Sequence, residues 1–154
     1  MIETAAKPRL LGINHVALEV GSVDDALAFY GQFFEFDLRG RGDRMAFIDL
    51  GDQFLALSQV DEPKRDHERH FGLVVDDREG LRAKLVAAGV EIVSEKRLDF
   101  MDPWGNRIEI VPYRDIQFIK DRGVLEKMDR GALEKTAAAR QELANKGIEP
   151  HSTV

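Results

Sequence analysis

Apolar and polar residues alternate along the first strongly patterned segment of the chain. In residues 10–20, LLGINHVALEV, every second position from Val16 to Val20 is Val or Leu. Alternation with a period of two is typical of a strand that buries one face. The pattern therefore predicts a strand whose other face carries His15 and Glu19.

The period then changes to that of a helix. Ser22 is a preferred helix cap, and Asp25 stands at the third helical position, where an acidic residue is favoured. Tyr30 and Phe34 continue an apolar stripe at helical spacing. We expect an amphipathic helix over residues 23–34.

Three short segments rich in β-formers follow the predicted helix. They are residues 36–39, 44–50 and 54–60, separated by Gly- and Asp-containing turns at 40–43 and 51–52. Short apolar runs divided by such turns are typical of a meander of adjacent strands.

The same order of elements returns after a polar connector at residues 61–68. Residues 70–75 predict a strand, and Asp76 and Asp77 can cap a helix that ends at Gly89. Further short strands are expected near 90–94, 96–101 and 106–111.

The two halves can be aligned with His15 over His70 and, after a gap of one residue, with Gly51 over Gly105. This alignment shows an internal repeat of about 55 residues, the mark of a duplicated supersecondary unit. The predicted fold class is α+β, with two βαβββ modules at residues 10–60 and 69–113. Together they make one domain, residues 1–113.

The repeat stops after Tyr113, and residues 114–154 form a predicted C-terminal extension. Residues 114–130 are mixed and charged, without a clear period. Residues 131–146 are rich in Ala, Leu, Glu and Lys and precede Gly147, which predicts a helix with a C-cap. Its apolar stripe is thin, so we expect it to pack on the surface or against a partner subunit.

Composition excludes several classes of protein. Among 154 residues, 22 are Lys or Arg and 28 are Asp or Glu, which gives a net charge of −6. An acidic chain of this kind disfavours binding to nucleic acid. The chain has 0 Cys, which excludes disulfides, thiolate metal ligands and a thiol nucleophile. Apolar runs are too short for a membrane span. We expect a cytoplasmic protein.

Three polar residues stand out as candidates for chemistry. His15 and His70 occupy matching positions at the head of each repeat, and Glu109 lies between Ile108 and Ile110 in the last predicted strand. If helices cover the apolar faces, all three side chains point into the space that the sheets enclose. A single such histidine is more often a structural residue of a sheet, but the repeat-related set of three favours a functional site.

These residues also carry a resemblance. The segments INHVALEVGSVDDALAFYGQFFEFDL, RHFGLVVDD and FMDPWGNRIEI resemble the vicinal oxygen chelate superfamily. Its members include glyoxalase I, extradiol dioxygenases, fosfomycin-resistance transferases, methylmalonyl-CoA epimerase and bleomycin-resistance proteins. The resemblance covers residues 10–113 and implies paired βαβββ modules whose mixed sheets curl around a metal-containing cleft. It places the metal ligands at His15, His70 and Glu109.

The resemblance implies a divalent metal ion as cofactor. Two imidazoles and a carboxylate suit Fe, Mn, Co, Ni or Zn and leave coordination positions open for substrate oxygens. The implied activity is a metal-dependent lyase, isomerase or dioxygenase acting on a small oxygen-rich substrate, with Glu109 and Tyr113 as candidate catalytic residues. A fosfomycin-type transferase would keep the same ligands but would need a more basic cleft.

Two readings of a different class stay open. Bleomycin-resistance relatives bind a drug between two subunits without metal or chemistry. A sensor or partner-binding module could use the extension at residues 114–150. In either case we expect a homodimer, because two small sheets leave exposed edge strands.

The resemblance also leaves one position unfilled. Glyoxalase I has a carboxylate on the last strand of the first module, and some relatives have Gln. The repeat alignment places Leu55 at that position, and a slip of two residues places Leu57 there. Neither can bind a metal, and Gln59 could do so only if the strand ran differently. The chain therefore departs from the glyoxalase I pattern.

Further side chains are candidates for lining the cleft and contacting the substrate. Arg44 or Arg97 could hold a carboxylate or phosphate of the substrate. The DPWGN sequence at residues 102–106 predicts a tight turn that aligns the strand of Glu109. We expect His67 to be exposed and His151 to have no role. The candidate lining residues are Arg41, Arg44, Phe47, Arg97, Trp104 and Tyr113.

Overall fold

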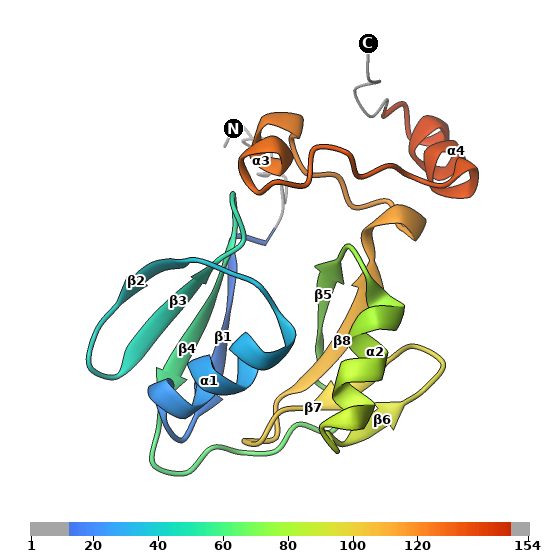
Figure 1. Cartoon of the computed structure of the whole chain (residues 1–154). Coiled ribbons are helices and arrows are strands. Elements are labelled where there is room, and N and C mark those ends of the chain that lie inside the picture. The colour runs from blue at the N-terminus through green and yellow to red at the C-terminus, as the bar shows by residue number, and fades with distance from the viewer. Residues whose placement is uncertain (1–12, 149–154) are drawn as a thin grey trace, which may run out of the picture.

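The computed structural model describes residues 13–148, which begin with a module of one helix and a four-stranded sheet (Figure 1). The sheet has the strand order β1-β4-β3-β2, and its first and last strands in sequence, β1 and β4, run parallel. The elements of this module are β1 (His15–Val20), α1 (Val23–Phe33), β2 (Leu38–Arg41), β3 (Met45–Asp49) and β4 (Phe54–Gln59).

The second module repeats this topology. Its sheet has the order β5-β8-β7-β6, again with a parallel pair formed by its first and last strands. The predicted repeat and the α+β fold class of two βαβββ modules are therefore confirmed. The elements are β5 (Phe71–Val75), α2 (Arg78–Ala87), β6 (Ile92–Ser94), β7 (Asp99–Met101) and β8 (Arg107–Pro112).

Local sequence signals set the helix starts. The Ser22 hydroxyl accepts a hydrogen bond from the Asp25 amide at 3.2 Å, and the Asp77 carboxylate accepts one from the Gly80 amide at 2.9 Å. Both bonds satisfy amide groups that have no partner within the first helical turn. Within residues 13–148, no helix is long and apolar enough to cross a membrane.

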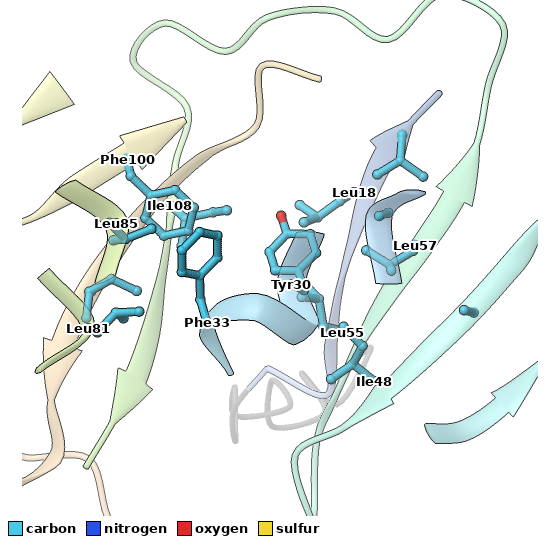
Figure 2. Close-up of a cluster of buried hydrophobic side chains, with 14 of the residues drawn as sticks. Leu18, Tyr30, Phe33, Ile48, Leu55, Leu57, Leu81, Leu85, Phe100 and Ile108 are labelled. Atoms are coloured by element: carbon cyan, nitrogen blue, oxygen red, sulfur yellow. The ribbon is translucent and has the colours of Figure 1, made fainter. Parts of the chain in front are cut away.

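The apolar core spans both modules, and α1 joins them. Figure 2 shows Tyr30 beside the aliphatic side chains of the first sheet and Phe33 beside those of the second module. Tyr30 and Phe33 are 1% and 9% exposed. Because one helix packs on both sheets, the relative placement of the modules is part of the folded core.

Buried hydrogen bonds reinforce this joint at the turn 102–106. The Tyr30 hydroxyl donates to Asp102 Oδ2 at 2.8 Å, and Asn106 Nδ2 donates to the Glu19 carbonyl at 2.8 Å. Asp102 also accepts from the amides of Trp104 and Asn106, each at 2.9 Å. Burial raises the pKa of Asp102, and the hydrogen bonds from Asn106, Tyr30 and Trp104 act in the opposite direction. The predicted turn therefore also ties the second module to the first.

The extension begins with a 3₁₀ turn, η1 (Tyr113–Asp115), and has two α-helices, α3 (Arg122–Lys127) and α4 (Ala137–Asn145). The prediction of a helix over 131–146 was wrong at its start. The Thr136 hydroxyl caps the amide of Ala139, so the helix begins at Ala137. Lys135, just before the cap, is buried rather than helical.

The extension contacts both modules. Lys120 donates to the Leu50 carbonyl at 2.7 Å and pairs with Asp52 in the first module. Arg130 pairs with Asp76 at 2.7 Å in the second module and with Glu35 at 3.4 Å in the first. Figure 1 shows α3 and α4 gathered at one end of the two sheets. The extension therefore bridges the modules at that end.

Candidate metal centre

His70 and Glu109 meet on the face of the second sheet that lies opposite its helix. Gly72 of β5 pairs with Glu109 of β8, whereas the neighbouring Ile108 and Ile110 are buried in the core. His70 lies one residue before β5, and its Nε2 is 3.4 Å from Glu109 Oε2. The two side chains are 34% and 25% exposed. Both polar groups are therefore accessible to a ligand.

The hydrogen bond of the other ring nitrogen determines which nitrogen of His70 is free. Nδ1 lies 2.9 Å from the Glu68 carbonyl, which can only accept. Nδ1 therefore carries a hydrogen, and in the neutral ring Nε2 presents its lone pair to the carboxylate of Glu109. Two lone pairs facing each other require a cation between them, either a proton or a metal ion. This arrangement of a histidine oriented through its second nitrogen is typical of metal ligands.

His15 lies on the corresponding face of the first sheet. Its ring stacks on Phe54 with centroids 4.6 Å apart, and its Nδ1 is 2.9 Å from Asn14 Oδ1. This bond again leaves Nε2 free in the neutral ring. The Arg39 guanidinium lies 4.8 Å from the centre of the Phe54 ring, on the same face.

The structure brings His70 and Glu109 together but does not add His15 to them. Among residues 13–148, no group of three or more His, Cys, Asp or Glu side chains is placed to hold a metal ion. His70 borders a groove of about 350 Å³, whose other wall is formed by residues 16–19 of β1. His15 is at the start of β1, outside that wall.

Asp99 and Arg107 also belong to this face, and sequence reasoning missed both. Asp99 of β7 pairs directly with Glu109 and is fully buried. Its Oδ2 accepts two hydrogen bonds from Arg107, at 3.0 and 2.5 Å. A signal was present in the sequence, because Arg107 is two residues before Glu109 and so falls on the same face of the strand.

The arginines predicted for the cleft have different surroundings. Arg97 is 55% exposed and lies 3.8 Å from Asp99 Oδ2, close to Glu109. Arg44 donates to the Gln59 carbonyl at 3.1 Å and pairs with Asp61, while Arg41 pairs with Asp24. Of the three, Arg97 approaches Asp99, the strand partner of Glu109.

The aromatic residues predicted to line the cleft also lie in different parts of the structure. Phe47 packs edge-on against Phe54, 5.7 Å away, beside His15. Trp104 packs edge-on against Phe29 of α1, 6.4 Å away, at the edge of the core. Tyr113 is 8% exposed, and its ring contacts Phe118 and Lys135 of the extension. Burial raises the pKa of Tyr113.

The remaining two histidines take no part in the pair. His67 is exposed in the connector, as predicted, and its carbonyl accepts from Arg107. His151 lies outside the described residues.

The prediction for the fourth ligand position was wrong by one residue. Leu55 and Leu57 are 2% and 0% exposed and face the core, because they pair with Val16 and Leu18 of β1. The residue that corresponds to Glu109 is Ala56, which pairs with Ala17 as Glu109 pairs with Gly72. A shift of one residue moves a strand's side chains to the opposite face.

Two further details of β4 complete this correction. The Gln59 side chain accepts from the Val23 amide at 3.2 Å, where it helps to start α1. Ala56, like the leucines proposed for this position, has no metal-binding atom. The expectation that this strand lacks a ligand therefore stands, with a different residue at the position.

The family model described as the Glyoxalase/Bleomycin resistance protein/Dioxygenase superfamily matches residues 12–110. The chain belongs to this superfamily. The match includes both modules and ends before the extension, so the extension lies outside the family model.

Curated relatives in the superfamily include proteins named metallothiol transferase FosB. The chain is 24% identical over 116 residues to the one from Bacillus licheniformis, which covers 66% of this chain and 75% of that relative. It is 28% identical over 111 residues to the one from Lysinibacillus sphaericus, with 63% of this chain and 79% of that relative covered.

Solved structures of superfamily proteins share the fold. A crystal structure of the fosfomycin resistance protein FosX from Listeria monocytogenes superposes with a TM-score of 0.58 at 16% identity, covering 66% of this chain and 91% of FosX. Lactoylglutathione lyase from Agrobacterium tumefaciens gives a TM-score of 0.54 at 21% identity, covering 70% and 96%.

Proposed function

We propose that this glyoxalase-superfamily protein is a divalent-metal-dependent enzyme acting on a small oxygen-rich substrate. Its metal ligands would be His70 and Glu109 of one chain and His15 of a second copy. The observation that carries the proposal is the approach of His70 Nε2 to Glu109 at 3.4 Å, with Nδ1 committed to a carbonyl. The chemistry of these donors fits a divalent cation, because an imidazole nitrogen and a carboxylate oxygen converge and, in the neutral ring, that nitrogen presents its lone pair.

The third ligand is assigned to a second copy for two reasons. Within residues 13–148, no third ligating side chain joins the pair. His15 occupies the repeat-related position, has the same free nitrogen and is exposed on an open sheet face. A homodimer that apposes the first module of one chain to the second module of the other would bring these donors together.

A divalent ion held by two imidazoles and one carboxylate supplies Lewis acidity and open positions for substrate oxygens. The chain's residues would orient the substrate around it. Arg97 presents an exposed guanidinium near Glu109, where it can bind an anionic oxygen. Phe47 and Phe54 would form an apolar wall beside His15.

The reaction we favour is Lewis-acid chemistry: group transfer, lyase or isomerase. The tyrosine that a dioxygenase could use, Tyr113, packs within the extension. The relatives named metallothiol transferase support transfer of a thiol to an electrophilic substrate as the first activity to assay.

A mixing experiment tests the metal site. Neither His15→Ala nor Glu109→Ala should assemble a complete three-ligand site alone. Mixed after reversible denaturation, they should form heterodimers in which one of the two sites is complete. We expect metal content and activity to return in the mixture. His67→Ala, which alters an exposed histidine of the connector, should match the wild type.

Three results would contradict the proposal. Wild-type protein purified without chelator that holds no divalent metal would favour the metal-free drug-binding class. Metal content unchanged in Glu109→Ala would rule out the assigned ligands. Metal content and activity that stay low after the two variants are mixed would rule out sharing of the site between copies.

A further inference from the structure

Arg107 links three segments around the candidate metal pair. It is the first residue of β8, and its guanidinium donates through Nε and Nη2 to Asp99 of β7 at 3.0 and 2.5 Å. Its side chain is 12% exposed and that of Asp99 is 0% exposed. A charged pair so well shielded from water holds a fixed geometry, because leaving either charge unpaired is costly.

The same guanidinium also holds the connector before β5. Nη1 donates to the His67 carbonyl at 2.8 Å, and the Arg107 amide donates to Asp66 Oδ2 at 3.3 Å. The Asp66 amide in turn donates to the Gly105 carbonyl at 2.7 Å. Residues 66 and 67 are therefore fastened to the start of the strand that carries Glu109.

His70 depends on this connector for its position. It precedes β5, and its Nδ1 bonds to Glu68, which belongs to the same connector. That bond fixes the ring against the connector but not against β8. Phe71 pairs with Ile108, so the β5–β8 ladder places the His70 backbone beside β8, and the connector held by Arg107 additionally restrains the ring through Nδ1.

The first module has a residue in the corresponding place. Phe54 precedes Ala56 by two residues, as Arg107 precedes Glu109, and Phe54 pairs with His15 across β1 and β4. Phe54 holds the His15 ring by stacking at 4.6 Å. In the first module, the residue at this strand position thus stacks on the repeat-related histidine. In the second module, it holds the connector that precedes that histidine.

We propose that Arg107 is a positioning residue that sets the His70–Glu109 separation for metal binding. The inference rests on the proposed metal function and adds to it a determinant of metal affinity. Its action runs through the connector, so Arg107 itself touches neither metal nor substrate. Loss of such an orienting contact typically weakens metal binding by about 10- to 100-fold.

Two variants separate positioning from stability. Arg107→Lys keeps a positive charge for Asp99, but one ammonium cannot reproduce the guanidinium's fork to Asp99 and the connector. The double variant Arg107→Met with Asp99→Leu removes both buried charges at similar volume, which is often neutral for stability. Arg82→Met is the matched control, because Arg82 lies in α2, on the helix side of the same sheet, and pairs with Glu79 at 3.1 Å.

The readouts are Co²⁺ affinity by titration, the Co²⁺ absorption spectrum, thermal unfolding, and the His70–Glu109 distance in crystals of the metal-free protein. We expect both Arg107 variants to stay folded, to bind Co²⁺ about 10- to 100-fold more weakly and to show an altered spectrum and a longer distance. Arg82→Met should bind Co²⁺ as the wild type does.

An unchanged distance in the folded double variant would overturn the positioning role. If the wild type binds Co²⁺, an unchanged Co²⁺ affinity and absorption spectrum in the double variant would also overturn the positioning role. If wild-type protein binds no Co²⁺, the proposed function fails, and the crystal distance still decides whether Arg107 positions His70.

Discussion

The Tyr30 hydroxyl donates a buried hydrogen bond of 2.8 Å to Asp102, which is 72 residues later in the chain. It joins the helix of the first module to the β7–β8 turn of the second. Burial, together with the charge and hydrogen bond of Asp102, raises the pKa of Tyr30 well above its ordinary value. The tyrosine therefore stays a hydrogen-bond donor at neutral pH.

The first prediction concerns this bond. Tyr30→Phe leaves the ring in place and removes one donor to a buried carboxylate, so we expect a loss of about 1–2 kcal/mol in the free energy of unfolding. Urea denaturation of the wild type, Tyr30→Phe, Asp102→Asn and the double variant completes a double-mutant cycle. A coupling energy below about 0.3 kcal/mol would show that the bond does not hold the modules together.

Lys135 supplies a prediction of pH dependence. It donates to the carbonyls of Tyr113 and Ile116 and lies 3.5 Å above the Tyr113 ring. Burial lowers its pKa from 10.5 to about 8, and the charge of Asp115 acts in the opposite direction. The folded state therefore loses this proton before the unfolded state does.

Because the unfolded chain binds more protons between pH 8 and 10.5, stability gains a positive contribution as pH rises through that window. Relative to Lys135→Met, the wild type should gain at most about 3 kcal/mol. Thermal or urea unfolding at several pH values measures the difference. The stability of Lys96→Met, a change at an exposed lysine, should vary with pH as that of the wild type does. If the pKa of Lys135 were ordinary, the stability of Lys135→Met would vary in the same way.

Much of the fold could be predicted because its signals are local. Cap residues such as Ser22 and Asp77 act within one helical turn, and the alternation around His15 lies within one strand. The extension was harder. Lys135 and Thr136 have good helical neighbours, but Lys135 is held by the carbonyls of Tyr113 and Ile116, and the helix begins only after Thr136. Hydrophobic periodicity in the sequence does not indicate such a contact.

The candidate site could be predicted only in part for a similar reason. The pairing of His70 with Glu109 follows from strand alternation in neighbouring strands. The register of β4 does not, because Ala56 is five positions after Gly51, whereas Glu109 is four positions after Gly105. The difference of one residue after the turn is visible only in the hydrogen-bonded pairing. Asp99 and Arg107 likewise require the β7–β8 pairing to be seen as partners.

Gly51 gives a prediction about the extension. Its φ of +92° favours glycine, and a Cβ there would lie 2.5 Å from Val124 of α3. Gly51→Ala should destabilise the protein by about 1–3 kcal/mol and loosen α3, through backbone strain and a clash. Hydrogen exchange of α3 and thermal unfolding measure this. Gly42→Ala is the control, because nothing lies within 4 Å of a Cβ at that position. Equal losses of stability in the two variants would contradict the close packing of α3 on Gly51.

The last prediction tests the corrected register and the metal site together. Ala56 lies opposite Ala17 as Glu109 lies opposite Gly72, so Ala56→Glu would place a carboxylate beside His15 and recreate the His–Glu pair in the first module. With the proposed shared site, it should raise metal affinity and reduce any activity that needs the open position. Leu57→Glu should instead bury a charge in the apolar core and unfold the protein, since Leu57 belongs to that core, whereas Ala56, although 3% exposed, does not. Ala56→Leu, with comparable bulk and no ligand, should leave metal affinity unchanged. Metal titration of each folded variant decides: equal affinity in Ala56→Glu and Ala56→Leu would mean that the first module's open face does not meet the metal.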